Sequence, residues 1–240
     1  IDLKGLNELS YIKYDAKEGL KLGATTTHRM IEKSDIIKKN YPVLAIMEEK
    51  LASVQVRNWG TIGGNLAHAD AAGDPAPVLI SLGATVKLGS KKGDRVMALE
   101  DFYTDLFETA MEQGEMILEV QVPPPPPKTG SAYQKFNLIE DDQGIVAVAV
   151  TVTADKSGVC SDAKIILGNA GVTPIRAKTA EKILIGNKLT DKLMVEAGEA
   201  AAGDADPVSD IHASADFRRH LIKVLTKRMV KQAWDQAIKG

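Results

Sequence analysis

TIGGNLAHADAAGD, residues 61–74, is the most specific pattern in this chain. The Gly63–Gly64 pair followed by Asn65 predicts a sharp backbone turn that presents unobstructed N–H groups. Such groups suit a phosphate or a carbonyl oxygen, and the carboxylates of Asp70 and Asp74 suit the hydroxyls of a sugar. A nucleotide-like ligand needs both, but paired glycines alone are more typical of a plain structural turn. Both interpretations stay open on these residues.

The composition bounds the class of protein. The 240 residues allow one large domain or two modest ones, each able to bury a core. Thirty basic and 32 acidic residues give a net charge of −2, which argues against a nucleic-acid partner or an anionic membrane surface. No apolar run approaches the span of a bilayer, and no signal peptide opens the sequence. We therefore expect a cytoplasmic protein with no membrane span.

The single cysteine limits redox chemistry. Cys160 cannot form an intrachain disulfide, and an iron–sulfur cluster needs about four thiolates. It lies in an expected strand, which favours a buried structural thiol. The histidines show no metal-ligand spacing and are expected to pack or face solvent; they are His28, His68, His212 and His220. Any metal redox centre must then lie on another polypeptide.

The first half of the chain alternates short strands and helices. Strands are expected at residues 11–14, 20–23, 84–88, 95–98 and 115–122. Helices are expected at residues 27–33, 42–51 and 75–82. Pro42 and Pro75 each stand at the first helical position, where a missing N–H costs nothing.

Five prolines, Pro123–Pro127, exclude a helix or a central strand and predict an extended connector. A second region follows, with strands expected at residues 131–138, 144–153 and 159–167. The polar turns at 140–144 and 154–158 favour antiparallel pairing of these three strands. Helices are expected at residues 175–185, 192–202 and 213–238. The architecture expected overall is α+β.

Residues 52–80, which include ASVQVRNWG (52–60), TIGGN and PVLI (77–80), resemble the FAD-binding medium subunit of the molybdenum hydroxylases, the family of the carbon monoxide and xanthine dehydrogenases. LGATTT (22–27), EMILEVQVP (115–123) and SAYQKF (131–136) match further motifs of that family. The resemblance extends over essentially the whole chain. It implies an FAD-binding domain at 1–122, a Pro-rich connector at 123–130 and a C-terminal α+β domain at 131–240, with a three-stranded antiparallel sheet and a helical layer.

The resemblance assigns cofactor contacts to the TIGGN segment. It implies that its five residues approach the FAD pyrophosphate and the flavin edge through backbone N–H groups and through the Thr and Asn side chains; they are Thr61, Ile62, Gly63, Gly64 and Asn65. Glycine is expected at 63 and 64 because a Cβ would strike the cofactor or demand a forbidden φ. For Thr61 alone, a hydroxyl that satisfies a turn is the other interpretation.

Further contacts are implied outside that segment. His68 and Asp70 match positions that line the ribityl or phosphate region, although His68 could instead hydrogen-bond the backbone. Asp74 either caps the helix beginning at Pro75 or hydrogen-bonds a cofactor hydroxyl, and the two roles are compatible. Ile117 matches an aliphatic residue that packs on the isoalloxazine, and it would look the same as plain strand core.

Lys135 matches the lysine of the family's Y-x-K strand. A cation beside the flavin stabilises its anionic reduced form and raises its reduction potential. The other interpretation is a solvated strand lysine. Where the family often carries Arg a few residues later, this chain has Leu138 and Ile139, so a second cationic contact is in doubt.

The implied function is electron transfer in a complex. FAD on this chain would receive electrons from [2Fe–2S] clusters on a small subunit, with the molybdenum cofactor on a large subunit, and pass them to NAD+, a quinone, ferredoxin or oxygen. No catalytic residue or metal ligand is assigned to this chain. A scaffold subunit that has lost FAD is the alternative. Because the sequence opens inside the family's L-I-D-L strand at Ile1–Leu3, the first FAD-binding lobe is expected to be a separate chain or a removed piece.

Overall fold

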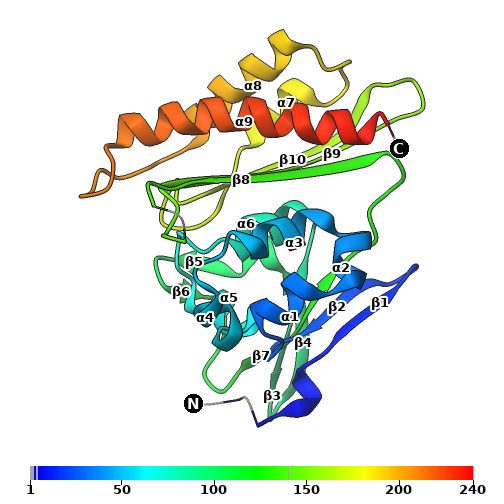
Figure 1. Cartoon of the computed structure of the whole chain (residues 1–240), viewed down its shortest axis with the longest axis vertical. Coiled ribbons are helices and arrows are strands. Elements are labelled where there is room, and N and C mark those ends of the chain that lie inside the picture. The colour runs from blue at the N-terminus through cyan, green and yellow to red at the C-terminus, as the bar shows by residue number, and fades with distance from the viewer. Residues whose placement is uncertain (1–2, 4, 140, 240) are drawn as a thin grey trace.

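The computed structural model describes residues 3, 5–139 and 141–239. Of the strand expected at Ile1–Leu3, residues 1 and 2 lie outside this described part, and Leu3 is assigned to no strand. In Figure 1 the first half of the chain forms the lower body, and the second half forms a sheet with helices above it. The architecture is α+β, as predicted.

The lower body is built on an antiparallel sheet in the order β1-β2-β7-β3-β4 within the described residues. Its strands are β1 (Ile12–Asp15), β2 (Gly19–Gly23), β3 (Thr85–Ser90), β4 (Gly93–Ala98) and β7 (Met116–Val122). A small hairpin, β5 (Tyr103–Asp105) with β6 (Glu108–Thr109), lies between β4 and β7 in sequence. All five strands expected in this half are confirmed to within about two residues.

Short helices connect β2 to β3. They are α1 (His28–Lys33), α2 (Asp35–Asn40), α3 (Pro42–Glu49), α4 (Val54–Trp59), α5 (Ile62–His68) and α6 (Pro75–Ser81). Four of these begin after a Ser or Thr whose hydroxyl accepts a backbone N–H of the first turn, the usual N-cap; the caps are Thr27, Ser34, Ser53 and Thr61. The sequence interpretation missed α2, α4 and α5, each only six or seven residues long.

The upper body is a sheet in the order β11-β10-β9-β8, antiparallel throughout. Its strands are β8 (Thr129–Phe136), β9 (Val146–Ala154), β10 (Cys160–Gly168) and β11 (Ile175–Arg176). Its helices are α7 (Lys178–Leu184), α8 (Asp191–Asp204) and α9 (Ala215–Ala237). The three expected strands are confirmed, and residues 123–128 form neither helix nor strand, as their prolines predicted.

One prediction for this half was wrong. The helix expected at 175–185 begins only at Lys178, because Ile175 and Arg176 pair with Leu167 and Ile166 as a fourth, edge strand. The sheet is therefore four-stranded rather than three-stranded.

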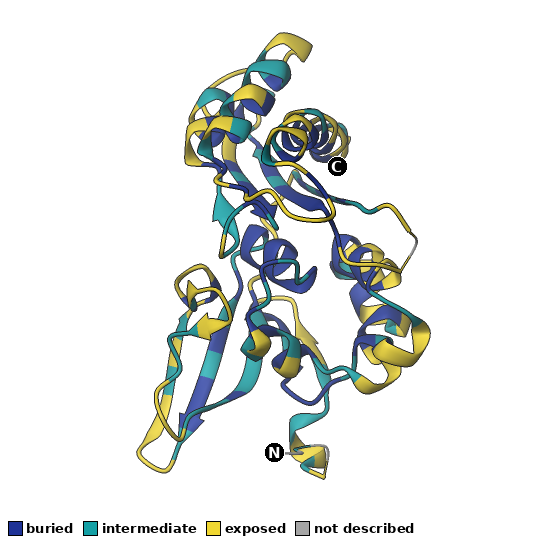
Figure 2. Ribbon diagram, turned by 90° about the vertical axis from the view of Figure 1, so that its left-hand side faces the viewer, coloured by how far each residue is buried: buried dark blue, intermediate teal, exposed yellow. Residues whose placement is uncertain are grey.

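The upper sheet is covered on both faces. Helices α7 and α9 pack on one face, with α8 against both of them, and α3 and α6 of the lower body lie beneath the other face (Figures 1 and 2). Four side chains of this sheet, Tyr133, Ala147, Ala149 and Ile166, belong to the hydrophobic cluster of the lower body. The remaining apolar side chains of the sheet form a second cluster with α7–α9, and Cys160 is buried there as expected.

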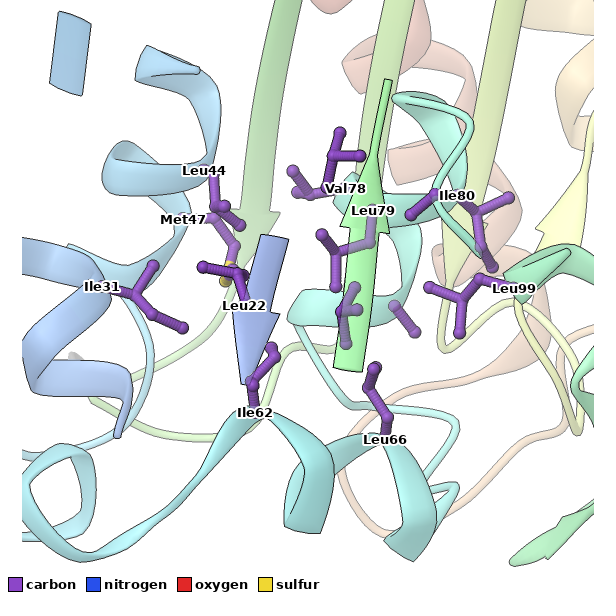
Figure 3. Close-up of a cluster of buried hydrophobic side chains, with 14 of the residues drawn as sticks. Leu22, Ile31, Leu44, Met47, Ile62, Leu66, Val78, Leu79, Ile80 and Leu99 are labelled. Carbon is purple, nitrogen blue, oxygen red and sulfur yellow. The ribbon is translucent and has the colours of Figure 1, made fainter. Parts of the chain in front are cut away.

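Figure 3 shows how α5 is fixed to this core. Ile62 and Leu66 extend from α5 toward Leu22 of β2 and Leu79 of α6, and all four side chains are fully buried. Burial of such an aliphatic side chain contributes roughly 1.5–3 kcal/mol. The outer face of α5, which carries Gly64 and His68, is left exposed.

Among the described residues, no helix has both the length and the apolar character needed to cross a bilayer.

Candidate functional site

A cavity of about 540 Å³ lies on the exposed side of α5. It is bounded by the end of β2, the start of α1, helices α4 and α5, and the segment that leads into β7. Its wall is mainly apolar, with hydroxyl, amide and imidazole groups on the α5 side. The lining residues are Leu3, Ala24, Thr25, His28, Leu51, Val56, Trp59, Gly60, Thr61, Gly63, Gly64, Asn65, Ala67, His68, Met111, Glu115, Met116 and Ile117.

The cavity collects six of the ten residues that the sequence singled out. These are Thr61, Gly63, Gly64, Asn65, His68 and Ile117. The other four, Ile62, Asp70, Asp74 and Lys135, are not part of its lining. Ile62 is a core side chain, and the remaining three lie toward the junction of the two bodies.

The glycine pair does not form the sharp turn that was predicted. Residues 62–68 are helical, and neither Gly63 nor Gly64 has a positive φ. Thr61 caps this helix: its hydroxyl accepts the Gly64 N–H at 3.2 Å. The turn expected at Gly63–Asn65 comes instead at Ala69, which ends the helix in the left-handed region at φ 54°.

The backbone donors of this segment are already engaged, which corrects a second expectation. The Ile62 N–H donates to Thr26 O at 3.0 Å, and the Gly63 N–H donates to Ala24 O at 2.9 Å. The Asn65 N–H bonds to Thr61 O within the helix. This segment can therefore contact a ligand through its side chains and by letting the ligand come close to the backbone. It does not present a row of free N–H groups.

The two glycines have different reasons to be glycine. A Cβ on Gly63 would lie 2.7 Å from the Ala24 Cβ and 2.8 Å from the Ala24 carbonyl oxygen, so Gly63 allows α5 to pack on the end of β2. A Cβ on Gly64 would meet only the Thr61 hydroxyl, at 2.9 Å, and otherwise face the cavity. Only Gly64 leaves room for a ligand.

The polar groups of α5 and the apolar side of β7 face the same cavity. The Thr61 hydroxyl and the Asn65 amide lie half-buried in its wall, and His68 is exposed with its ring 5.2 Å from that of Phe107. Ile117 is 4% exposed and belongs to both the cavity wall and the core. The arrangement is amphipathic, with hydrogen-bonding groups opposite a flat apolar surface.

Asp74 and Lys135 contact each other. Lys135 Nζ lies 2.8 Å from Asp74 Oδ2, and the Tyr133 hydroxyl donates to Asp74 Oδ1 at 2.6 Å. Burial raises the pKa of the Asp74 carboxyl, and the adjacent ammonium and hydroxyl partly offset that rise. Asp74 makes no side-chain cap to α6, so the alternative interpretation as a helix cap does not hold, and Lys135 is buried rather than solvated.

The Asp70 carboxylate accepts hydrogen bonds in the loop after α5. One of its oxygens accepts the Ala72 N–H at 2.9 Å, and the other accepts the Gln143 side-chain amide at 3.2 Å. Where Arg was noted as missing, Leu138 and Ile139 are exposed.

Sequence reasoning missed several residues of the cavity wall. Val56 and Trp59 of α4 are 50% and 70% exposed there, although both are large and apolar. Arg57 of the same helix is buried and donates to Glu32, and to the Leu51 and Ala52 carbonyls, which holds α4 against α1. The signal available in the sequence was the set of apolar residues around an arginine, shortly before the glycine pair.

His28 is a second residue that was missed, because histidine was expected only to pack or face solvent. Its ring lines the cavity, is 2% exposed, and contacts the buried Glu48 carboxylate. Burial raises the pKa of Glu48.

Comparison with known proteins identifies the family. The domain described as the FAD binding domain in molybdopterin dehydrogenase matches residues 1–125, and the CO dehydrogenase flavoprotein C-terminal domain matches residues 131–233. The chain belongs to the FAD-binding medium subunits of the molybdenum hydroxylases.

Similar proteins support this membership over the whole length. The 6-hydroxypseudooxynicotine dehydrogenase complex subunit alpha of Paenarthrobacter nicotinovorans is 35% identical, over 99% of this chain and 80% of the relative. The carbon monoxide dehydrogenase medium chain of Afipia carboxidovorans is 32% identical, over 97% of this chain and 80% of its own. The crystal structure of quinoline 2-oxidoreductase from Pseudomonas putida 86 contains a similar chain. Its sequence identity to this chain is 31% and its TM-score is 0.91, over 98% of this chain and 81% of that one.

The cavity fits the cofactor of this medium-subunit family. FAD combines a flat aromatic ring system with hydroxyls and phosphates, and the wall offers apolar Ile117 and Trp59 together with the Thr61 hydroxyl and the Asn65 amide. Gly64 adds a position at which a ligand can approach the backbone closely. Among the described residues, no group of three or more His, Cys, Asp or Glu side chains could hold a metal ion.

Proposed function

We propose that this chain is the electron-transfer flavoprotein subunit of a molybdenum hydroxylase complex and that it holds FAD in the cavity beside α5. The observation that carries the proposal is the position of the TIGGN segment, which supplies one wall of a cavity of about 540 Å³ in a chain of this family. The division into a cofactor-binding part at 1–122, a connector at 123–130 and a C-terminal part at 131–240 is proposed with it.

Each wall of the cavity would have its own task. The Thr61 hydroxyl, the Asn65 amide and the His68 ring would hydrogen-bond polar parts of the cofactor. Ile117 would pack against its flat apolar part, and Gly64 would let it approach α5. When bound, FAD supplies a centre that takes up electrons and releases them; the protein contributes position and electrostatics.

The predictions that Asp70, Asp74 and Lys135 contact FAD stay predictions. In this structure the Lys135 ammonium is engaged by Asp74 at 2.8 Å. Contact with the cofactor would require Lys135 or Asp74 to exchange that partner for FAD. Ile62 would act indirectly, by anchoring α5 in the core.

We also propose that residues outside this sequence complete the FAD cradle. Support comes from the engaged N–H groups of Ile62, Gly63 and Asn65, which leave the diphosphate without backbone donors from this segment. The named relatives are longer, since this chain spans about 80% of them. Isothermal titration of FAD into the 240-residue chain, with and without the additional segment of a relative, tests this. Tight stoichiometric binding by the 240 residues alone would contradict it.

The partners proposed are a small subunit with [2Fe–2S] clusters and a large subunit with the molybdenum cofactor; the first FAD-binding lobe could form a further chain. The support is membership of a family whose relatives are named as medium or alpha subunits. We place the complex in the cytoplasm, where a single thiol such as Cys160 remains reduced. Purification through a tag on this chain, followed by metal analysis, tests the partners, and cell fractionation tests the location.

The alternative function is a scaffold subunit that has lost FAD. The absorbance spectrum of the purified complex distinguishes the two functions. Stoichiometric flavin absorbance that bleaches when substrate is added supports electron transfer. A complex that assembles without flavin supports the scaffold.

A further inference from the structure

His28 is the one buried ionisable side chain in the described wall of the cavity that keeps a ring atom available. The other two ionisable lining residues are occupied or exposed. Glu115 accepts from the Arg95 guanidinium at 2.7 Å and from the Glu112 N–H. His68 is exposed and lies against Phe107.

His28 contacts Gly60 through both its backbone and its ring. Its backbone N–H donates to Gly60 O at 3.1 Å, which ties the start of α1 to the junction of α4 and α5. A Cβ on Gly60 would lie 3.0 Å from His28 Cδ2, so the Gly60 backbone already borders the ring. The imidazole therefore packs against the Gly60 backbone at the junction of α4 and α5.

Glu48 fixes which ring nitrogen is available. His28 Nδ1 lies 3.1 Å and 3.0 Å from the two Glu48 carboxylate oxygens, and Glu48 has no solvent exposure. A carboxylate in this position keeps a proton on Nδ1, which donates to it. Nε2 is left as the ring atom that can meet a ligand.

Within the described part of the chain, the hydrogen bonds of the His28 ring go through Nδ1, and none is made by Nε2. The cavity wall that contains His28 also includes the apolar side chains of Leu51, Val56 and Trp59. A ring nitrogen in such a wall can donate or accept a hydrogen bond to a ligand that fills the cavity.

We propose that His28 Nε2 hydrogen-bonds a polar atom of the bound cofactor, and that Glu48 is the positioning residue that holds the ring for this contact. The inference rests on the proposed binding of FAD in this cavity. It gives the cofactor a polar contact on the apolar α4 side, opposite the polar groups of α5.

Nitrogen NMR of the histidine rings tests the contact directly. The full chain is labelled with 15N-histidine, with the additional FAD-binding segment present if the chain alone binds weakly, and FAD is added. The Nε2 resonance of His28 is expected to shift, whereas those of His212 and His220 stay in place. An unshifted His28 Nε2 in FAD-saturated protein would overturn the inference.

Substitutions separate a cofactor contact from a structural role. His28→Leu with Glu48→Leu replaces the buried pair by two apolar side chains, a change that folded proteins commonly tolerate. We expect its FAD dissociation constant to rise about ten-fold because one hydrogen bond is lost. Glu48→Gln keeps an oxygen that accepts from Nδ1, so its affinity should stay within about two-fold of the parent.

His220→Leu, an exposed histidine on α9, is the matched control and should leave FAD affinity unchanged. Equal FAD affinity in the parent and in the folded double-leucine variant would overturn the His28 contact alone. Failure of the parent to bind FAD, even with the additional segment, would overturn the proposed function itself.

Discussion

The Lys135 ammonium lies 2.8 Å from the Asp74 carboxylate, and this ion pair joins the two bodies of the molecule. Asp74 precedes α6 of the lower body, and Lys135 belongs to β8 of the upper sheet. Their side chains are 8% and 3% exposed. Because Tyr133 and the Asp142 carbonyl satisfy further hydrogen bonds of the pair, it fixes how the upper sheet sits on α6.

Removal of one member of this pair should destabilise the protein strongly. Asp74→Ala leaves the Lys135 charge buried without a counter-ion, and we expect a loss of about 3–5 kcal/mol in the free energy of unfolding. Lys135→Met should cost a similar amount. Urea unfolding followed by circular dichroism measures both. The double variant Asp74→Leu with Lys135→Met should lose less than either single variant, because no unpaired charge remains.

The exposed pair of Lys231 and Asp235 on α9 is the matched control for that experiment. Its atoms lie 3.2 Å apart, but both side chains are about half exposed. Asp235→Ala should therefore change the free energy of unfolding by less than about 0.5 kcal/mol. A loss for Asp74→Ala no larger than this control value would show that the buried pair does not hold the two bodies together.

The two glycines of α5 should respond differently to substitution. Gly63→Ala drives a Cβ to 2.7 Å from the Ala24 Cβ, so it should destabilise the fold by about 1–3 kcal/mol. Gly64→Val faces the cavity, so it should leave the fold largely intact while FAD affinity falls more than about ten-fold. Thermal unfolding and FAD titration of both variants give the two readouts. Equal FAD content in the Gly64→Val variant and the parent complex would rule out close approach of the cofactor at Gly64.

Periodicity and turn residues predicted the longer elements well. Apolar runs, capping residues and flanking glycines predict strands such as 146–154 and the long helix α9. The four-residue strand β1 was found because it faces a matching strand across a tight turn. The short helices α4 and α5 were missed because six or seven residues give only a weak helical signal. In α5 two glycines lower the helical propensity further, and tertiary packing of Ile62 and Leu66 supports its conformation.

The candidate site could also be predicted only in part, because several of its contacts join residues that are distant in sequence. The segment 61–68 was identified from its pattern, but the engagement of its N–H groups depends on Ala24 and Thr26, which are distant in sequence. The Lys135–Asp74 pair spans 61 residues of chain, and no local pattern reveals it. His28 was missed for the same reason, because its partner Glu48 lies on another helix.

Asp210 should make the free energy of unfolding depend on pH in the acidic range. Backbone N–H groups of Ala213 and His212, together with the Arg218 guanidinium, lower its pKa in the folded state to about 2. Since the unfolded value is about 3.9, the stabilisation is fully present above about pH 4 and is lost as the pH falls toward 2. Asp210→Asn should flatten the dependence of the urea midpoint on pH between about 4 and 2.

The same variant should also lose stability at neutral pH, since Arg218 is buried and would lose its carboxylate partner. A loss of about 1–3 kcal/mol is expected at pH 7. Asp216→Asn, on the exposed first turn of α9, is the control and should change neither the midpoint nor its slope with pH. An unchanged slope for Asp210→Asn would mean that its carboxylate is not stabilised in the folded protein.

Trp59 should contribute to cofactor affinity without contributing much to the fold. Its side chain lines the cavity from α4 and is 70% exposed, so Trp59→Ala removes little buried surface. A ligand that covers the indole would bury much of that ring, and aromatic side chains often contribute strongly in such contacts. We expect FAD affinity to fall about ten-fold while the urea midpoint stays near that of the parent. Trp59→Phe keeps an aromatic face and should recover most of the affinity. Ile211→Ala, at a side chain 95% exposed on the far loop, controls for the loss of any exposed apolar group and should change neither measurement. FAD affinity that is equal in Trp59→Ala and Ile211→Ala would place the cofactor away from α4.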